Sequence, residues 1–339
     1  MRCERVIHQK NTTPEVLPSL AVLCPVYNEQ ATIPLFFDRM SQVFDRIRGH
    51  CNPSLYFIDN GCHDRSYEII QELHNRYPGV YVIVLSRNFG YQGALGCALR
   101  TVVADLYVMI DVDCEDPPEM VVDFLRYYKE GYDIVFGERV DRPEPVPLKV
   151  ARKFFYHLVH NVADDNFVLN MAEFSLITGE VRDAVIQEIN SFPFLRASIG
   201  SAGFRRKNIP YTRHARIAGE THYNLVGMTM FAIAGIMSAS TVALRLAAYA
   251  FPLCFFLMAA LVVLAIISPA YWHVPVLLFL GFSFIGFSCV ATGLYTARIY
   301  KNGLQRPNAI IRYGRSILPP EHQSSCLTPR SETSSQLLL

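Results

Sequence analysis

The sequence predicts an α/β protein with a mostly parallel sheet and flanking helices, followed by a hairpin of two membrane-spanning helices. Between residues 20 and 137, short apolar runs alternate with stretches of helical periodicity, as in strand–helix–strand units of parallel sheets. Acidic and polar side chains follow several of these runs directly. Near the C-terminal end lie two uncharged stretches of 23 residues each.

The predicted strands are short, apolar and separated by stretches of helical length. The strands cover Leu20–Val26, Leu55–Ile58, Val80–Leu85, Leu106–Ile110 and Tyr132–Phe136. The helices cover Ala31–Ile47, Ser66–Arg76, Gln92–Val103 and Pro118–Glu130. Ligands of such sheets bind beyond the carboxyl ends of the strands, so we expect the chemistry there.

After Arg139 the alternation ends. Three prolines between residues 143 and 147 indicate a loop, and helical periodicity resumes from about Lys149 to Val162. A basic stretch over residues 205–216 leads into an uncharged segment with helical periodicity. We predict an amphipathic helix on the membrane surface over residues 224–245, with a buried domain helix as the alternative.

The two uncharged stretches predict transmembrane helices at residues 246–268 and 275–297. Each is long enough to cross a hydrocarbon core of roughly 30 Å. Arg245 precedes the hairpin and Arg298 and Lys301 follow it, whereas the turn at Trp272 has no Lys or Arg. This bias predicts that both chain ends are cytoplasmic. The remaining parts are an N-terminal extension (1–18), a cytosolic domain (19–223) and a tail (300–339), disordered after about residue 320.

Composition excludes some classes of protein. The 31 basic and 30 acidic side chains leave a net charge of +1, which argues against a nucleic-acid partner. The nine cysteines are scattered and lack the paired spacing of a zinc site. We therefore expect reduced thiols in a cytosolic domain.

The strongest candidate site is the acidic segment from Asp111 to Pro118, which follows the strand that ends near Ile110. Asp111 and Asp113 are two residues apart and project to the same side, and Glu115 adds a third carboxylate. Such oxygen ligands suit Mg²⁺ or Mn²⁺ bridging a diphosphate. The alternative is an acidic turn that caps the next helix, which explains Asp116 but not two acids at the end of a buried strand.

Two further polar segments follow the first two strands, at Pro25–Glu29 and Asp59–Ser66. A carboxylate at a strand end can accept hydrogen bonds from a base or ribose, and Tyr27 can stack on a base. Together with Asp111 they predict a nucleotide pocket. The glycine signatures of dinucleotide-binding oxidoreductases and of P-loop enzymes do not occur.

These motifs in this order resemble the family 2 glycosyltransferases of the polyprenyl-phosphate type, which include dolichol-phosphate mannose synthases and bacterial bactoprenol glucosyltransferases. The matching segments are Pro25–Glu29, Asp59–Gly61, Ser86–Gly90, Asp111–Pro118, Gly137–Arg139, Arg213–Glu220 and Arg306–Pro307. The resemblance covers about Leu20 to Arg312 and implies a GT-A-type domain. The two-helix hairpin is similar to the bacterial branch.

The resemblance also implies roles for single residues. Nucleotide-sugar binding would fall to Pro25, Tyr27, Glu29, Asp59 and Asp111. Mg²⁺ or Mn²⁺ would be held by Asp111, Asp113 and Glu115, and the phosphate of the lipid acceptor by Arg139, Arg152, Arg213 and Arg216. Arginine suits this task because it stays charged and binds phosphate bidentately. Attraction to anionic lipid headgroups is the alternative explanation for the basic stretch.

Three positions depart from the family pattern. Glu173 stands where an Asp proposed as the base is usual, His222 stands where a Lys is usual, and Cys62 where a Ser is common. We take Glu173 and Asp113 as the catalytic candidates.

The predicted reaction transfers a hexose from a UDP-sugar to undecaprenyl phosphate, with inversion, at the cytosolic face of the cell inner membrane, for cell-surface glycan modification or glycolipid synthesis. Membrane lipids are further partners, and a homo-oligomer is compatible with the sequence. One alternative is a mannose synthase that uses GDP-mannose, and another is a non-catalytic membrane scaffold. A processive polysaccharide synthase is disfavoured, because the Gln-x-x-Arg-Trp segment of those enzymes is absent and Trp272 is the only tryptophan.

Overall fold

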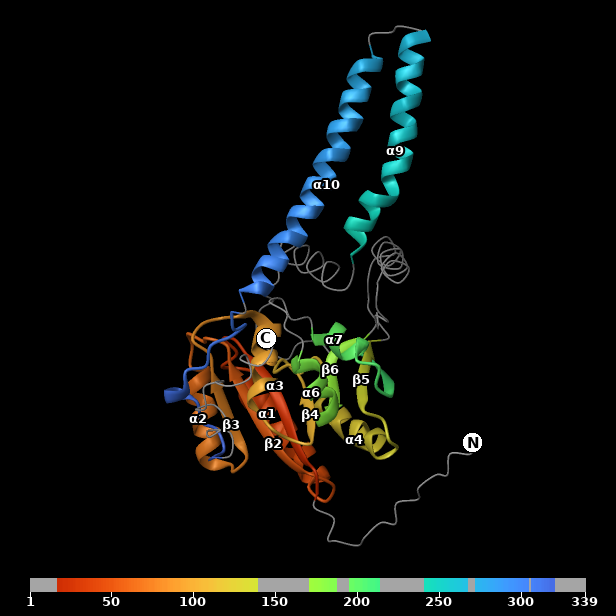
Figure 1. Cartoon of the computed structure of the whole chain (residues 1–339). Helices are drawn as coiled ribbons and strands as arrows, with labels where there is room; N and C mark the ends of the chain where they lie inside the picture. Colours follow the sequence, from red (N-terminus) through yellow and green to blue (C-terminus); the bar gives the residue numbers. More distant parts are fainter. Residues whose placement is uncertain are drawn as a thin grey trace, which may run out of the picture.

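The computed structural model describes residues 17–139, 171–187, 195–213, 241–267, 272–304 and 306–320. Within these ranges the chain forms an α/β domain with a seven-stranded sheet, from which two long helices extend (Figure 1). The strands are β1 (Ser19–Val26), β2 (Asn52–Asp59), β3 (Val80–Val84), β4 (Leu106–Met109), β5 (Ile134–Arg139), β6 (Met171–Thr178) and β7 (Arg206–Tyr211). The helices of the domain are α1 (Ile33–Ile47), α2 (Ser66–Arg76), α3 (Gly90–Thr101), η1 (Pro118–Met120), α4 (Val121–Lys129), α6 (Gly179–Gln187) and α7 (Leu195–Ser201). They are followed by α9 (Val242–Ile267), α10 (His273–Gly303) and the short η2 (Tyr313–Arg315).

The strand order is β3-β2-β1-β4-β6-β5-β7. Strand β1 is parallel to both β2 and β4, and β3 is parallel to β2. Strand β6 runs antiparallel to β4 and β5, and β7 is parallel to β5. The predicted mostly parallel sheet is therefore confirmed, and the carboxyl ends of the other six described strands share the edge at which β6 begins.

The sequence analysis did not predict β6 and β7. Strand β7 lies at the edge of the sheet, and its side chains alternate between exposed and partly buried, so Arg206 and Lys207 make it look like a basic loop. Strand β6 is mostly buried, but Glu173 and Ser175 interrupt its apolar run. Neither segment has the continuous apolar run that identified the parallel strands.

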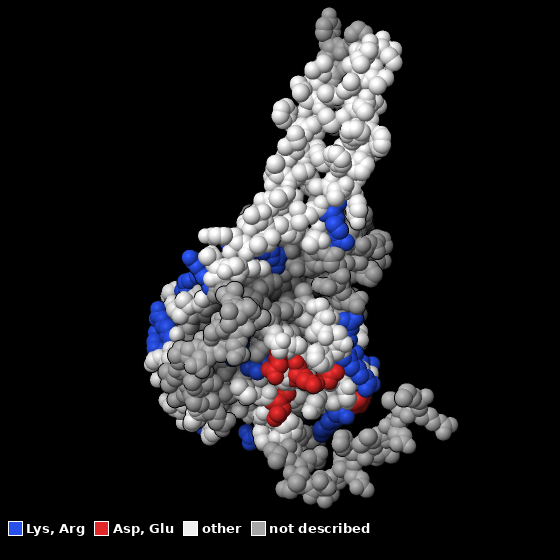
Figure 2. All heavy atoms as spheres, viewed as in Figure 1, with Lys and Arg blue, Asp and Glu red and all other residues white. Residues whose placement is uncertain are grey.

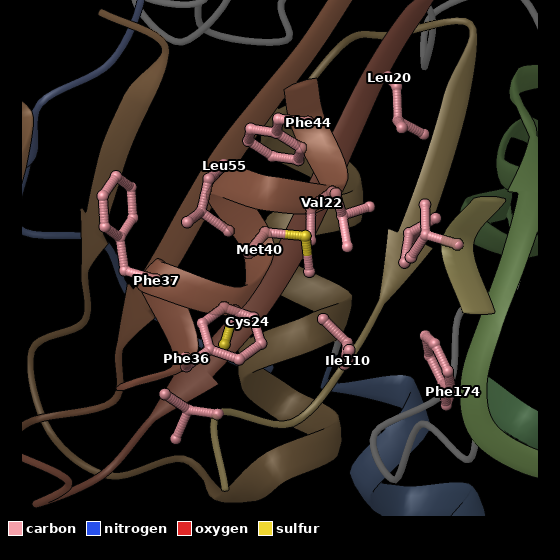
Figure 3. Close-up of a cluster of buried hydrophobic side chains, with 14 of the residues drawn as sticks. Leu20, Val22, Cys24, Phe36, Phe37, Met40, Phe44, Leu55, Ile110 and Phe174 are labelled. Atoms are coloured by element: carbon pink, nitrogen blue, oxygen red, sulfur yellow. The ribbon is translucent and has the colours of Figure 1, made fainter. Parts of the chain in front are cut away.

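Helices cover both faces of the sheet. The apolar residues of α1 recur every three or four positions, from Ile33 to Ile47, and all of them are buried. They pack with α2 and α4 on one face, where Phe36 and Met40 meet Val22 and Cys24 of β1 (Figure 3). Alternate β1 residues point to the other face, which is covered by α3, α6 and α7. Burial of each large apolar side chain stabilises such a core by about 1.5–3 kcal/mol.

The helices α9 and α10 have the length and composition of membrane spans. The segments Leu244–Ile267 and Val274–Gly303 are long and apolar enough to cross a membrane. Large apolar side chains such as Ile266 and Phe279 are more than 70% exposed. Figure 2 shows these helices without charge over most of their length, with Lys and Arg near the domain. Such a surface suits lipid rather than water.

The segment after α10 returns to the sheet and covers its β3 edge. Val82 pairs with Ile317 and Leu85 with Ile311 in antiparallel bridges. Ser316 Oγ accepts a hydrogen bond of 2.9 Å from the backbone N–H of Val84. This pairing satisfies an otherwise open strand edge and joins α10 to the α/β domain. The first part of the predicted C-terminal tail is thus folded against the sheet.

Several predictions concern parts of the chain that lie outside the described residues. They are most of the N-terminal extension, the helix predicted from Lys149 to Val162, the surface helix up to residue 240 and the tail after residue 320.

Candidate active site

The loops after β1 and β2 are bound to each other. The backbone N–H of His63 donates to Asn28 Oδ1 at 2.9 Å, and the N–H of Glu29 donates to Ser66 Oγ at 3.0 Å. Asn28 has a φ of 55°, a left-handed conformation that asparagine tolerates better than most residues. Asp59 is buried, and its Oδ1 accepts from the N–H of Cys62 at 2.8 Å. The structure thus brings four predicted nucleotide-binding residues to the carboxyl ends of the neighbouring strands β1 and β2 or just beyond them: Pro25, Tyr27, Glu29 and Asp59.

A third loop packs onto this pair. The side chain of Asn60 donates to Asn88 Oδ1 at 3.1 Å and accepts from the N–H of Phe89 at 2.9 Å. Gly61 has a φ of +78°, and a Cβ atom there would lie 2.7 Å from the carbonyl carbon of Arg87. The Ser86–Gly90 motif is therefore fixed against the loop after β2.

A pocket of about 490 Å³ lies beside the first two loops. It is lined by Asn28, Glu29, Gln30, Ala31, Thr32, His63 and Asp64. Glu29 is the one predicted nucleotide-binding residue in this lining, so the pocket adjoins the predicted nucleotide site and does not contain it.

The acidic loop after β4 concentrates negative charge. Burial raises the pKa of Asp111 to about 7, and the charges of Asp113 and Asp116 contribute to this rise. Burial raises the pKa of the Cys24 thiol, and the charges of Asp111, Asp113 and Glu29 add to this rise. All three carboxylates therefore lie close enough to Cys24 to act on the same thiol. Carboxylates gathered in this way repel one another unless a proton or a cation compensates them.

A divalent cation would fit at Asp111 and Asp113, two partly or fully buried carboxylates, because after burial it is the charge of Asp113 that most raises the pKa of Asp111. Asp113 is only 5% exposed, and its Oδ1 accepts from the N–H of Glu115 at 3.0 Å. Glu115 itself forms an ion pair with Arg213, with 2.6 Å between Nη1 and Oε2. Among the described residues, no three His, Cys, Asp or Glu side chains form a ready-made metal site. The role of Glu115 as a third ligand stays a prediction.

Asp116 is the centre of a buried polar cluster. Its carboxylate accepts from Tyr211 Oη and from Arg139 Nη2, the latter at 3.3 Å, and it lies 3.5 Å from Arg213 Nε. Although burial opposes the charge of Arg139, Asp116 and Tyr211 raise the pKa of its guanidinium group. The interpretation of Asp116 as a helix cap is wrong, because η1 follows Pro117 and has no side-chain capping bond.

A glycine makes this cluster sterically feasible. A Cβ atom at Gly137 of β5 would lie 2.6 Å from the ring of Tyr211. Because Gly137 lacks this atom, the ring packs closely against β5, and its hydroxyl group accepts from Arg139 Nε at 3.1 Å. The Gly137–Arg139 motif therefore provides both the room for the Tyr211 ring and the arginine that binds its hydroxyl group.

Glu173 lies near the start of β6. Met109 of β4 pairs with Ser175, so Glu173 is two residues closer to the site edge. Its Oε1 accepts from Gln92 Nε2 at 3.0 Å. Burial raises the pKa of Glu173, while Arg196, Gln92 and Arg139 oppose the rise. The charges of Arg139 and Arg196 therefore act on the Glu173 carboxylate.

Three residues that sequence reasoning missed belong to this edge, namely Tyr91, Gln92 and Tyr211. Burial, followed by the charges of Asp111 and Glu173, raises the pKa of Tyr91, so its hydroxyl group lies near both carboxylates. Tyr91 and Gln92 directly follow the Ser86–Gly90 motif, and this adjacency was the available signal. No sequence signal indicated Tyr211. The predicted phosphate ligands Arg152 and Arg216 lie outside the described residues.

The fold and the site define a class of protein. An α/β sheet whose carboxyl edge carries paired carboxylates next to anchored arginines is suited to transfer reactions of phosphate-bearing substrates. The family model described as "Glycosyl transferase family 2" matches residues 21–187. The uncharacterized glycosyltransferase YkcC of Bacillus subtilis is 33% identical over 231 residues, which cover 68% of this chain and 71% of that protein. The chain therefore belongs to glycosyl transferase family 2 and is a glycosyltransferase.

Other relatives extend the comparison. A prophage bactoprenol glucosyl transferase homolog of Escherichia coli is 29% identical over 235 residues, covering 68% of this chain and 75% of that protein. An uncharacterized glycosyltransferase of Synechocystis is 25% identical over 317 residues, covering 89% and 98% of the two chains. Among solved structures, glucosyl-3-phosphoglycerate synthase from Mycobacterium tuberculosis in complex with UDP is similar at a TM-score of 0.45 and 21% identity, covering 65% and 79%. This last likeness is too distant to support a conclusion about ligands.

Proposed function

We propose that this glycosyltransferase moves a hexose from a UDP-sugar to a polyprenyl phosphate, undecaprenyl phosphate, at the cytoplasmic face of the inner membrane. The observation that carries the proposal is the meeting of the Asp111–Asp113 pair with Arg139 and Arg213 at one sheet edge, in a chain with two apolar helices. The relatives named bactoprenol glucosyl transferase support the choice of acceptor.

The donor half of the proposed reaction uses the first three loops and the acidic segment. Pro25, Tyr27, Glu29 and Asp59 would bind the nucleoside. Asp111 and Asp113 would hold Mg²⁺ or Mn²⁺, which supplies charge compensation for the departing diphosphate. The raised pKa of Asp111 supports this role, since a cation removes the repulsion that otherwise favours its protonated form.

The acceptor half uses the arginines that Asp116 holds. A phosphate monoester has a second pKa near 6, so the acceptor is mostly ionised at neutral pH. The protein must then orient this nucleophile more than activate it. Arg139 is fixed by Asp116 and Tyr211, whereas Arg213 pairs with Glu115 and can exchange that carboxylate for the acceptor phosphate.

Glu173 would complete the acceptor half. It lies within reach of Arg139 in a buried position that raises its pKa. There it can take the residual proton of the phosphate or fix the angle of attack. Attack on the anomeric carbon from the side opposite the nucleotide gives the inverted product.

The proposed donor and acceptor are tested together in one experiment. Purified protein in lipid nanodiscs with undecaprenyl phosphate and Mn²⁺ is given UDP-hexoses and GDP-mannose in parallel, and the lipid product is analysed by mass spectrometry. We expect the mass of one hexose to be added from a UDP-sugar, and no product when EDTA replaces Mn²⁺. Product from GDP-mannose alone would establish the mannose synthase alternative, and product on soluble acceptors only would contradict the lipid acceptor.

The proposed membrane topology has a separate test. In a background without accessible native cysteines such as Cys289, single cysteines are placed next to Trp272 and at Ser324. We expect an impermeant thiol reagent to label the first from outside the cell and the second only after the cytoplasmic side is opened. Labelling of both from the same side would show that the hairpin does not span the membrane.

A further inference from the structure

Gln92 connects Glu173 to the start of α7. Its Nε2 donates to Glu173 Oε1 at 3.0 Å, and its Oε1 accepts from the backbone N–H of Leu195 at 2.9 Å. A backbone N–H only donates and an ionised carboxylate only accepts, so the two partners determine which way the amide group faces. The side chain of Gln92 therefore has one orientation that satisfies both contacts.

The position of Gln92 is fixed from the other side as well. Gln92 lies in the first turn of α3, which begins at Gly90 with a φ of +76°. The N–H of Gly90 donates to Asn88 Oδ1 at 2.8 Å, and Asn88 is bound in turn by Asn60 at the end of β2. A short chain of hydrogen bonds thus links the predicted nucleotide loop to the residue that holds Glu173.

A neutral donor has a specific effect on a buried carboxylate. The amide N–H favours the ionised form of Glu173 without placing a full positive charge beside it, as an arginine would. It also restrains a side chain that has one more rotatable bond than aspartate, which lowers the entropy that Glu173 must lose in the reacting complex. Because the carboxylate is planar and rigid, holding Oε1 also limits the directions in which the second oxygen, Oε2, can point.

We propose that Gln92 is a positioning residue, which holds Glu173 through Oε1 so that Oε2 meets the acceptor phosphate. This inference rests on the proposed function of Glu173. Gln92 acts on the reaction through Glu173 and does not contact the acceptor itself. Its contact with Leu195 keeps the amide group turned toward Glu173.

A double-mutant cycle in the proposed transfer assay tests this role. Gln92→Met keeps the length of the side chain but removes both hydrogen bonds, and Glu173→Gln removes the charge. At saturating donor and acceptor, we expect kcat to fall about 10-fold for Gln92→Met and about 100-fold for Glu173→Gln, the low end of general-base effects. The double variant should be no slower than Glu173→Gln alone, because one residue acts through the other.

A second variant separates Glu173 from α7. Gln92→Glu keeps an acceptor for the N–H of Leu195 but replaces the donor to Glu173 by a like charge. We expect this variant to lose at least as much kcat as Gln92→Met, measured at a temperature where both variants are folded, because two adjacent, partly buried carboxylates repel each other. The matched control is Gln71→Met on the exposed face of α2, which should keep the full rate.

The outcomes distinguish the inference from the function on which it rests. Losses that multiply in the double variant, or a full rate for Gln92→Glu, would overturn the positioning role of Gln92. A full rate for Glu173→Gln would instead contradict the proposed role of Glu173 itself. Lipid product formation by the unsubstituted protein is measured in the same series, so a failed assay is not mistaken for either result.

Discussion

The two halves of the site edge are held in place by different kinds of interaction. At the ends of β1 and β2, side chains bind the backbone of nearby loops, as Asp59 does with the N–H of Cys62, three residues away. Around the ends of β4, β5 and β7 and the start of β6, charged and polar side chains bind one another across longer sequence separations. Asp116 and Tyr211 are 95 residues apart, and Gln92 and Glu173 are 81 apart. The contacts of the first half join loops that follow neighbouring parallel strands, such as Asn28 and His63, 35 residues apart, whereas those of the second half also need the antiparallel β6 and the edge strand β7.

This difference predicts different sensitivities to substitution. Bonds from a side chain to backbone stabilise a loop conformation, so their loss affects folding first. Contacts between ionised side chains orient groups that meet a substrate, so their loss affects binding and turnover first. The predictions below compare the two halves, from the largest expected effect to the smallest.

The largest effect is expected at the acidic segment between the halves. Asp113→Asn should lower turnover about 1,000-fold or to background, because the charge compensation of a metal site contributes several kcal/mol to the transition state. The protein should stay folded and membrane-bound. The measurement is the initial rate of lipid product at saturating Mn²⁺.

Asp45→Asn is the matched control, because it makes the same change at a largely exposed aspartate, which pairs with Arg48. It should keep full activity. Turnover of Asp113→Asn within twofold of the unsubstituted protein would exclude Asp113 as a metal ligand.

The second effect concerns the half that depends on tertiary contacts. Asp116→Asn removes the carboxylate shared by Arg139 and Arg213, and charge-assisted bonds of this kind are worth about 1.5–3 kcal/mol. We expect the Michaelis constant for the lipid acceptor to rise about 10- to 100-fold, with a smaller change for the donor. Steady-state kinetics with each substrate varied in turn measure this difference.

The control is Asp123→Asn, whose arginine partner Arg126 is on the surface of α4. It should leave both Michaelis constants unchanged. If Asp116→Asn weakened the donor and the acceptor equally, the arginine cluster would not be specific to the acceptor half.

The third prediction concerns pH and the pKa of Asp111, which burial raises to about 7. Metal binding requires the ionised carboxylate, so Mn²⁺ affinity should rise up to about tenfold per pH unit below pH 7 and level off above it. Without metal, raising the pH has the opposite effect on folding: it lowers the free energy of unfolding. The folded state favours the protonated group, so its stabilising contribution is complete below about pH 4 and is lost as the pH rises toward 7.

Isothermal titration with Mn²⁺ from pH 5.5 to 8.5 measures this dependence. In Asp111→Asn, this pH dependence should be absent, and most of the affinity for Mn²⁺ should be lost as well. An affinity that is constant across this range would show that Asp111 does not titrate when the metal binds.

The smallest effect on catalysis is expected in the half at the ends of β1 and β2. Gly61→Ala places a Cβ atom 2.7 Å from the backbone of Arg87 at a φ of +78°. Such strain should lower the free energy of unfolding by about 1–3 kcal/mol. The rate per folded molecule should change little at low temperature, and thermal unfolding of the purified protein measures the loss of stability.

Gly49→Ala is the control, because a Cβ atom at Gly49 would meet nothing within 4 Å. An unchanged unfolding temperature for Gly61→Ala would show that the loops after β2 and β3 are not packed as rigidly as their hydrogen bonds indicate.

The same contrast explains which elements were predictable. Strands β1 to β5 have continuous apolar runs, and helix α2 covers the predicted range from Ser66 to Arg76. The predicted spans lie along α9 and α10. They were predictable because a long uncharged run has the length and composition of a membrane-crossing helix. Strands β6 and β7 were missed, because a reversed strand and an edge strand owe their place to partners far away in sequence.

The candidate site divides in the same way. The carboxylates Asp59, Asp111 and Asp113 were recognised because each follows a buried strand, and the parallel sheet brings these ends together. Asp116 was noticed but misinterpreted as a cap, because its partners Arg139 and Tyr211 come from other strands. Gln92 was predicted only as the start of a helix, because its one signal as a site residue was that it closely follows the Ser86–Gly90 motif.

The sequence by itself determined strands β1 to β5, the helices between them, the apolar hairpin and the edge at which the carboxylates gather. Periodicity and the positions of polar residues after strands are local properties, and they act before any tertiary contact exists. Only the tertiary structure decided that Asp116 holds two arginines, that Gly137 admits the ring of Tyr211 and that Gln92 holds Glu173. These contacts require the antiparallel β6 and the edge strand β7 to be in register, because hydrogen bonds and ion pairs of this kind form only within a few ångströms.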